Sequence, residues 1–157
     1  TFDAVNMGEV LEHLPDPTGM LEIANGLLNK NGLLCLVVPN DFNPFQIILR
    51  DHLGFKPWWV APPHHLNYFN QESLRGLVER AGFKVLHIAN TFPIDMFLLM
   101  GENYIGNDDI GRKCHAFRMN FEQAIIGSGA NELMSKMYSA LGEIGVGREI
   151  VMYAQKC

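Results

Sequence analysis

The stretch FDAVNMGEVLEHLPDP, residues 2–17, decides the fold. Its first five residues, Phe2 to Asn6, have the apolar character of a buried strand, and a polar loop follows them. Asp16 and Pro17 then form a helix start, with an N-cap carboxylate and a proline at the first helical position. A strand that runs through a loop into a helix is typical of the interior of an α/β domain.

The rest of the chain continues this alternation. A helix is predicted up to Lys30, where Asn31-Gly32 ends it, and the unbroken apolar run LLCLVVP at 33–39 predicts a strand covered on both faces. A short helix is expected at 45–53, a loop rich in proline and aromatic residues at 54–69, a helix at 71–82 and strands at 83–89 and 148–155. We therefore expect one domain over residues 1–157, with about four strands and a helical insertion at 92–147.

Composition excludes several classes of protein. The chain has 157 residues, 48% of them hydrophobic, which is enough for a buried core. A net charge of -5 disfavours DNA as a partner. The three cysteines are odd in number and widely spaced, so we expect no disulfide framework and a reducing cytoplasm. No apolar run is long enough to span a bilayer, so no membrane partner is expected.

Four segments, in this order, resemble the second half of a class I S-adenosylmethionine-dependent methyltransferase. They are FDAVNMGEVLEHLPDP, LLNKNGLLCLVVPN, HHLNYFNQESLRGLVERAGFKVLHI and REIVMYAQ. The Glu-His-Leu within the first segment is similar to that of ubiquinone-biosynthesis O-methyltransferases. The resemblance implies an incomplete Rossmann-like methyltransferase sheet, with its last strand antiparallel and S-adenosylmethionine as the methyl donor. It also implies that the glycine-rich loop and the acidic ribose-binding residue of the family precede Phe2, so this chain by itself is expected to be inactive.

The chemically most informative residues are Glu9, Glu12 and His13. If the segment makes one helical turn, their spacing puts all three on one face, as an acid/base cluster or half of a divalent metal site. Oxygen-rich ligation with one histidine suits Mg²⁺ or Mn²⁺ better than a structural zinc. The pattern resembles the metal-binding one of ubiquinone-biosynthesis and small-RNA 2′-O-methyltransferases, which implies Glu9, Glu12 and His13 as metal ligands. By resemblance to the RNA enzymes alone, HHLNYF places His65 as a further metal ligand. The alternative is that Glu12 and His13 form hydrogen bonds with loop backbone and that His64 or His65 caps the next helix.

Without a metal, His65 or His13 is a candidate general base, because an imidazole can take the proton of a hydroxyl. Asn6, Met7 and Gly8 end the first strand, where ligands of open α/β sheets bind, and by resemblance they border the methionine part of the cofactor.

Further candidates lie on the next segments. Asn40 is a candidate for orienting the acceptor. Trp58 and Trp59 have flat faces suited to sugar rings, although packing is the favoured explanation for them.

The resemblance implies O-methylation of a small molecule or a sugar-containing metabolite. Two alternatives stay open: an RNA 2′-O-methyltransferase-like enzyme, and a non-catalytic binding or oligomerisation module. Because the strand at Phe2 is expected in the interior of a complete sheet, an open edge there predicts a homodimer or a helix that covers the edge.

Overall fold

The computed structural model describes all of residues 1–157 and contains one four-stranded sheet. Its elements, in chain order, are β1 (Phe2–Gly8), the 3₁₀ turn η1 (Leu11–His13), α1 (Pro17–Leu27), β2 (Leu28–Pro39), α2 (Pro44–Asp51), α3 (Gln71–Arg80), β3 (Phe83–Asn90), α4 (Asp95–Leu99), α5 (Asp108–Gly127), α6 (Asn131–Glu143) and β4 (Glu149–Lys156).

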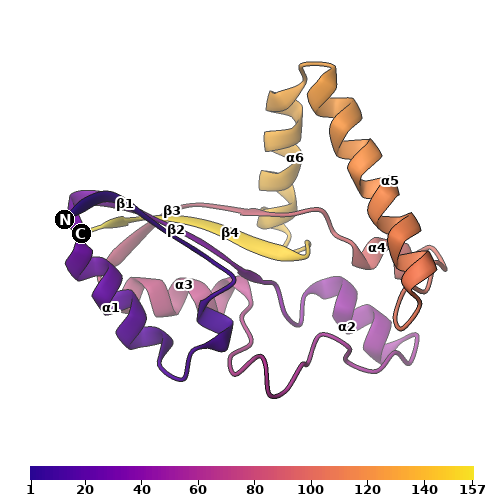
Figure 1. Cartoon of the computed structure of the whole chain (residues 1–157), viewed down its shortest axis with the longest axis horizontal. Coiled ribbons are helices and arrows are strands. Elements are labelled where there is room, and N and C mark those ends of the chain that lie inside the picture. Colours follow the sequence, from indigo (N-terminus) through magenta and orange to yellow (C-terminus); the bar gives the residue numbers. More distant parts are fainter.

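The sheet has the strand order β1-β2-β4-β3. β1 and β2 pair in parallel, whereas β4 lies antiparallel between β2 and β3. The chain thus crosses from β2 to the edge strand β3 and returns through β4, as Figure 1 shows. This arrangement confirms the α/β fold with about four strands and an antiparallel last strand.

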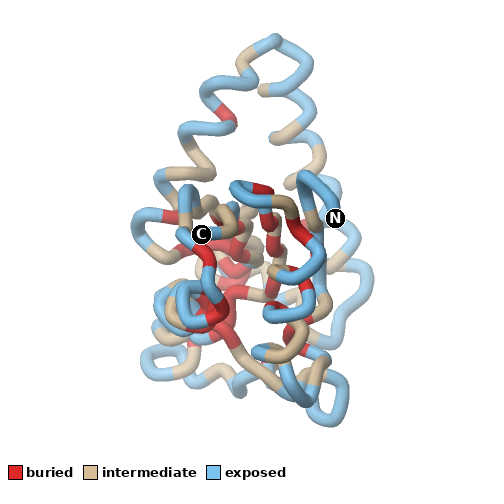
Figure 2. Tube along the Cα trace, turned by 90° about the vertical axis from the view of Figure 1, so that its left-hand side faces the viewer, coloured by how far each residue is buried: buried red, intermediate tan, exposed pale blue.

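One face of the sheet carries the hydrophobic core. Helices α1 and α3 cover this face (Figure 1), and the buried residues gather between them and the central strands (Figure 2). Leu34, Leu36, Ile150 and Met152 on β2 and β4 are completely buried. The prediction that the apolar run of β2 is covered on both faces was wrong, because burial alternates along it: Leu34 and Leu36 are buried, whereas Leu33 is exposed. Helices α1 and α3 cover only the face that carries the core.

Helix α1 ends earlier than the sequence predicts. It stops at Leu27, and Leu28 already pairs with Phe2 of β1. The register then shifts, so that Ala4 pairs with Leu33, and Asn31 adopts a left-handed φ of 64° within the intervening bulge. The predicted helix end at Asn31-Gly32 was wrong because strand pairing supplies backbone hydrogen bonds that local propensity does not include.

Helices α5 and α6 form an antiparallel pair that projects from the other side of the sheet (Figure 1). Only Cys114 of α5 and Met134 and Gly142 of α6 are buried. Gly142 sets how closely α6 approaches the sheet, because a Cβ there would lie 2.8 Å from the carbonyl oxygen of Ile88 on β3.

Gly147 joins this helical pair to β4 and cannot accept a side chain without strain. Its φ is 143°, and a Cβ would lie 2.6 Å from the carbonyl oxygen of Thr91. We expect Gly147→Ala to lower the free energy of unfolding by about 1 to 3 kcal/mol, measured by chemical denaturation. The control is Gly111→Ala in α5, where a Cβ meets nothing within 4 Å. Equal stability of the two variants would contradict the prediction.

Strand β1 lies at one edge of the sheet and pairs only with β2. Five of its seven residues are exposed, including Phe2. No helix in the structure has both the length and the apolar character needed to cross a bilayer.

Candidate active site

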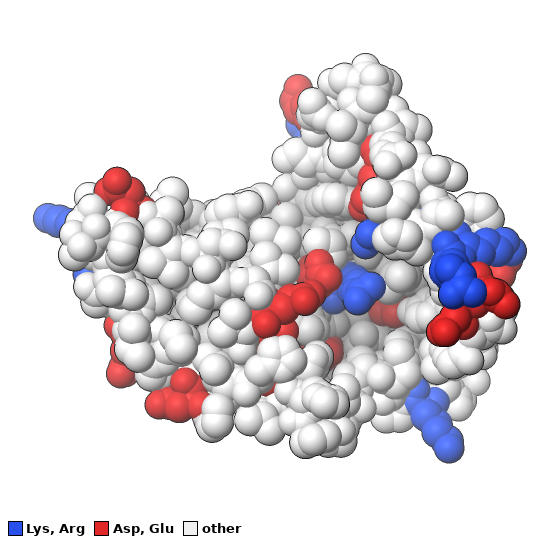
Figure 3. Space-filling model, viewed as in Figure 1, with Lys and Arg blue, Asp and Glu red and all other residues white.

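A cavity of about 360 Å³ opens where β1 and β2 end. Because β4 is antiparallel to β2, its first residues reach the same edge, with Pro39 opposite Glu149. Charged side chains of both signs meet in a hollow on this face of the molecule (Figure 3). The cavity is lined by Glu9, Glu12, His13, Pro39, Asp41, Gln46, Trp58, Trp59, His65, Ile94, Asp95, Tyr104, Arg148 and Glu149.

Backbone contacts bring the loop that carries His65 to the turn that carries His13. The carbonyl oxygen of Glu12 accepts hydrogen bonds from the backbone N–H groups of Leu66 and Asn67, at 2.7 and 3.0 Å. The Asn67 side-chain amide also donates to two carbonyl oxygens of the same turn, at 3.0 and 2.7 Å. The sequence analysis missed Asn67, whose only signal was an amide side chain within an otherwise aromatic segment.

Glu12, His13 and His65 form a compact cluster at the cavity wall. The Glu12 side chain is only 1% exposed, and its Oε1 lies 3.7 Å from Nε2 of His13. The rings of His13 and His65 are edge to face, with centroids 4.9 Å apart. Burial raises the pKa of the Glu12 carboxyl above its ordinary value, although a backbone hydrogen bond and the two histidines oppose this effect.

The orientation of His13 is fixed by one contact. Its Nδ1 lies 2.6 Å from the carbonyl oxygen of His64. A carbonyl oxygen can only accept, so Nδ1 carries the hydrogen and donates it. In the neutral ring, Nε2 therefore presents its lone pair beside Glu12.

The same three residues have the chemistry of a divalent metal site. One ligand atom from each lies within 4.8 Å of the others. Glu12 Oε2 and His65 Nδ1 are buried and form no hydrogen bond within the protein. The contact from His13 to a backbone carbonyl is the kind that orients metal-binding histidines. This donor set therefore fits a divalent cation.

Glu9 does not join this cluster. It lines the cavity, but it has a left-handed φ of 53° and precedes the 3₁₀ turn, which begins at Leu11. The expectation that one helical turn carries Glu9, Glu12 and His13 on a single face was wrong, because the strand continues to Gly8 and the turn that carries Glu12 and His13 begins only at Leu11.

The three residues predicted to border the cofactor end β1. Met7 packs into the hydrophobic core, so its side chain is not available to a ligand, whereas Asn6 is exposed. Gly8 has no atom within 4 Å of the position that a Cβ would take. The backbone at Gly8 therefore offers open space for a close approach of a ligand.

Asp41 was missed by the sequence analysis. It follows the end of β2 and is only 2% exposed, and its Oδ2 forms no hydrogen bond within the protein. Burial, with a smaller contribution from the nearby Glu12 charge, raises the pKa of Asp41 to about 7. A left-handed φ at Phe42 and the side-chain cap of α2 by Asn43 fix the turn that places it.

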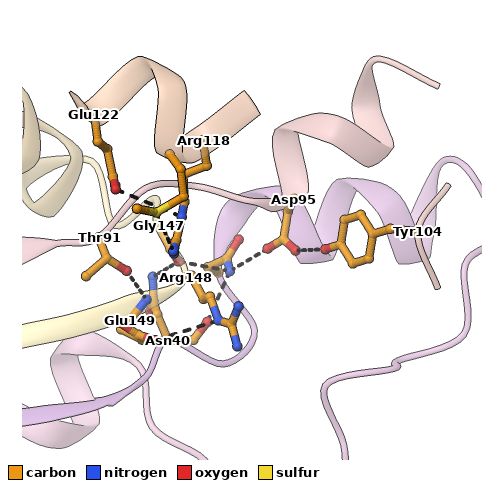
Figure 4. Close-up of polar contacts among 11 residues, drawn as sticks. Asn40, Thr91, Asp95, Tyr104, Arg118, Glu122, Gly147, Arg148 and Glu149 are labelled. Carbon is orange, nitrogen blue, oxygen red and sulfur yellow. Dashed lines mark hydrogen bonds and ion pairs between the residues drawn. The ribbon is translucent and has the colours of Figure 1, made fainter. Parts of the chain in front are cut away.

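Another part of the lining depends on polar contacts between the loop after β2, the start of β4 and the start of the insertion (Figure 4). Asp95 accepts hydrogen bonds from Tyr104 Oη at 3.1 Å and from the Asn43 amide at 3.2 Å. Burial raises the pKa of Asp95, and these hydrogen bonds oppose the shift. Arg148 lies 3.6 Å from Glu149.

Asn40 and the two tryptophans, which are candidates from the sequence, differ in how far the protein itself occupies them. The Asn40 amide donates to the carbonyl oxygens of Gly145 and Gly147, at 2.9 and 3.1 Å, so its hydrogens are used within the protein. Trp59 is buried and contacts Phe42 edge to face, whereas Trp58 is half-buried at the cavity wall.

A family model described as a methyltransferase domain matches residues 1–88, which is more than half of the chain. The chain belongs to this methyltransferase family. The matched region contains β1, β2 and the cluster of Glu12, His13 and His65. No curated protein gives a significant sequence match.

Solved structures share the fold of this methyltransferase domain. An S-adenosylmethionine-dependent methyltransferase from Archaeoglobus fulgidus has a TM-score of 0.53 and 17% identity, over 98% of this chain and 59% of that one. Phosphoethanolamine N-methyltransferase 2 of Haemonchus contortus, solved with S-adenosylmethionine, has a TM-score of 0.52 and 15% identity, over 99% and 33%. The [4+2]-cyclase SpnF has a TM-score of 0.51 and 16% identity, over 99% and 50%.

This chain therefore spans between a third and three fifths of the length of these relatives. Because these structures are only 15 to 17% identical to this chain, their similarity establishes the fold alone. Their names include a cyclase and an N-methyltransferase.

Proposed function

We propose that this chain forms the acceptor side of an S-adenosylmethionine-dependent enzyme that methylates a hydroxyl group of a small molecule. The observation that carries the proposal is the orientation of His13, with Nδ1 held by the His64 carbonyl and Nε2 beside the buried Glu12. Because Nδ1 already carries a hydrogen, only Nε2 of the neutral His13 ring can accept a proton from the methyl acceptor.

S-adenosylmethionine supplies an electrophilic methyl group. Asn6, Met7 and Gly8 would border its methionine part, and the open space at Gly8 supports this placement. As the acceptor oxygen bonds to the methyl carbon and the carbon–sulfur bond breaks, His13 Nε2 accepts the hydroxyl proton. The Glu12 carboxylate stabilises the imidazolium that forms, and His65, whose Nδ1 has no partner within the protein, holds the hydroxyl in place.

Glu12, His13 and His65 would hold Mg²⁺ or Mn²⁺ if the enzyme uses a metal. The ion would supply positive charge that lowers the pKa of the acceptor hydroxyl. A metal-free enzyme needs the same cluster as a base. The two forms differ in one measurable property, the effect of a chelator on the rate.

Charge argues against an RNA acceptor. Among the cavity-lining residues, five carboxylates face a single arginine, and a phosphate backbone would be repelled there. The five are Glu9, Glu12, Asp41, Asp95 and Glu149.

The proposal is tested with the intact protein, S-adenosylmethionine carrying a ¹³C-labelled methyl group, and a panel of hydroxylated small molecules. We expect a ¹³C signal at the chemical shift of a methyl ether, with S-adenosylhomocysteine formed in equal amount. Methylation on nitrogen alone, or no transfer to any member of the panel, would refute it. Repeating the assay with EDTA and with added Mg²⁺ or Mn²⁺ separates the metal-dependent form from the metal-free form.

A further inference from the structure

Six buried side-chain atoms of the protein form no hydrogen bond, and five of them belong to residues that line the one cavity described above. These five are Glu12 Oε2, Asp41 Oδ2, Gln46 Oε1, Trp59 Nε1 and His65 Nδ1. Buried polar groups are nearly always paired in folded proteins, because an unpaired one loses its hydration without compensation. Their convergence on a single cavity indicates that a ligand supplies the missing partners.

The unpaired atoms also specify what kind of ligand fits. The three oxygens, from Glu12, Asp41 and Gln46, can only accept when the carboxyls are ionised, and the Trp59 N–H can only donate. A ligand that satisfies them must therefore present mainly hydrogen-bond donors. Asp41, Gln46 and Trp59 are more than nine-tenths buried, so bulk water satisfies them poorly.

The charge of the cavity selects among donor-rich ligands. Arg148 is the only lysine or arginine in the lining, and it lies 3.6 Å from Glu149. Asp41 has no cationic partner, and the pKa of its carboxyl is raised because burial and Glu12 disfavour a further negative charge. A ligand with a positive charge relieves this repulsion, whereas a neutral polyol leaves it unchanged. The exposed part of the Trp58 ring adds a surface suited to a cation.

We propose that Asp41 and Gln46, whose unpaired oxygens accept, form a subsite that binds a protonated amino group of the acceptor, and that the Trp59 N–H donates to a hydroxyl oxygen of the same ligand, so that the substrate class is the hydroxylated amines. This inference rests on the proposed function, because it places the acceptor hydroxyl at His13 and the ammonium group at Asp41. A protonated amine has no lone pair and cannot attack the methyl group. The subsite would thus direct methylation to oxygen.

The test is calorimetric binding of matched probes to the chain, without S-adenosylmethionine and in the presence of EDTA. The probes are ethanolamine with ethylene glycol, and glucosamine with glucose, because each pair exchanges one amino group for a hydroxyl. We expect each amine to bind about ten- to hundredfold more tightly than its neutral partner, as a charge-assisted hydrogen bond implies. Asp41→Asn should abolish this preference. Asp51→Asn, on the exposed end of α2, should retain it.

Equal affinity for the amines and their neutral partners would overturn the inference, and so would an Asp41→Asn protein that still prefers amines. The wild-type comparison holds even if a variant fails to fold. Amine binding without methyl transfer to oxygen would refute the proposed function and leave the subsite intact. Methyl transfer to hydroxyls without any preference for amines would support the proposed function and refute the amine subsite.

Discussion

Replacing His13 by glutamine should lower the rate of methyl transfer by roughly a hundredfold to ten-thousandfold, the usual contribution of a positioned general base. Glutamine can keep the hydrogen bond to the His64 carbonyl, which His13 makes at 2.6 Å, but it cannot take up a proton. The loss should therefore appear in the chemical step and not in acceptor binding. Single-turnover transfer of a labelled methyl group in the intact protein measures this step directly.

The matched control is His52→Gln, which changes an exposed histidine at the end of α2 outside the cavity lining. Its rate should equal that of the wild type. If His13→Gln also transfers methyl groups at the wild-type rate, the proton leaves the acceptor by another route. The role assigned to His13 would then be wrong.

Replacing Asp41 by asparagine should raise the free energy of unfolding by about 2 to 4 kcal/mol near pH 8 and change it little near pH 4. Burial raises the pKa of Asp41 to about 7 in the folded protein, from an ordinary value of 3.8. Below the ordinary value the carboxyl is protonated in both states. Between the two values only the folded state holds the proton, so wild-type stability falls as pH rises, and above about 7 the full cost of a buried charge is present.

Denaturant unfolding of the wild-type and Asp41→Asn chains at several pH values measures the effect, because the asparagine side chain does not titrate in this range. The control is Asp51→Asn on the exposed end of α2, where the carboxyl pairs with Arg50 and its pKa is lowered. This control should give no gain in stability at high pH. If the difference in the free energy of unfolding between wild type and Asp41→Asn does not change with pH, the pKa of Asp41 is the same in the folded and unfolded states. The prediction would then be wrong.

The cost of Asp41 to stability and its proposed role in binding a ligand have the same cause, the burial of its carboxyl. A buried carboxylate that has no cationic partner and whose Oδ2 forms no hydrogen bond destabilises the fold, and its only evident benefit is to a ligand that enters the cavity. Sites of this kind are where natural sequences depart from the rules that favour stability. The cavity of this methyltransferase domain follows that pattern.

Local signals in the sequence were sufficient for most of the secondary structure. Asp16 caps α1 by accepting from the Gly19 N–H, and Asn70 caps α3 together with Ser73, both at the positions that the sequence indicated. The apolar run at 33–39 forms a central strand, and Gly82 ends α3 with a left-handed φ of 84°. Capping and periodicity act within a few residues, so the sequence displays them directly.

The sequence by itself thus determined the order of strands and helices, the family and the presence of histidines suited to proton transfer. Only the tertiary structure decided that α1 ends at Leu27, that Glu9 stays outside the cluster and that His65 lies beside His13. It alone revealed that Asp41 is buried and that its Oδ2 forms no hydrogen bond. The physical reason is that strand pairing and burial join residues that are far apart along the chain, and their energies depend on neighbours that no local pattern contains.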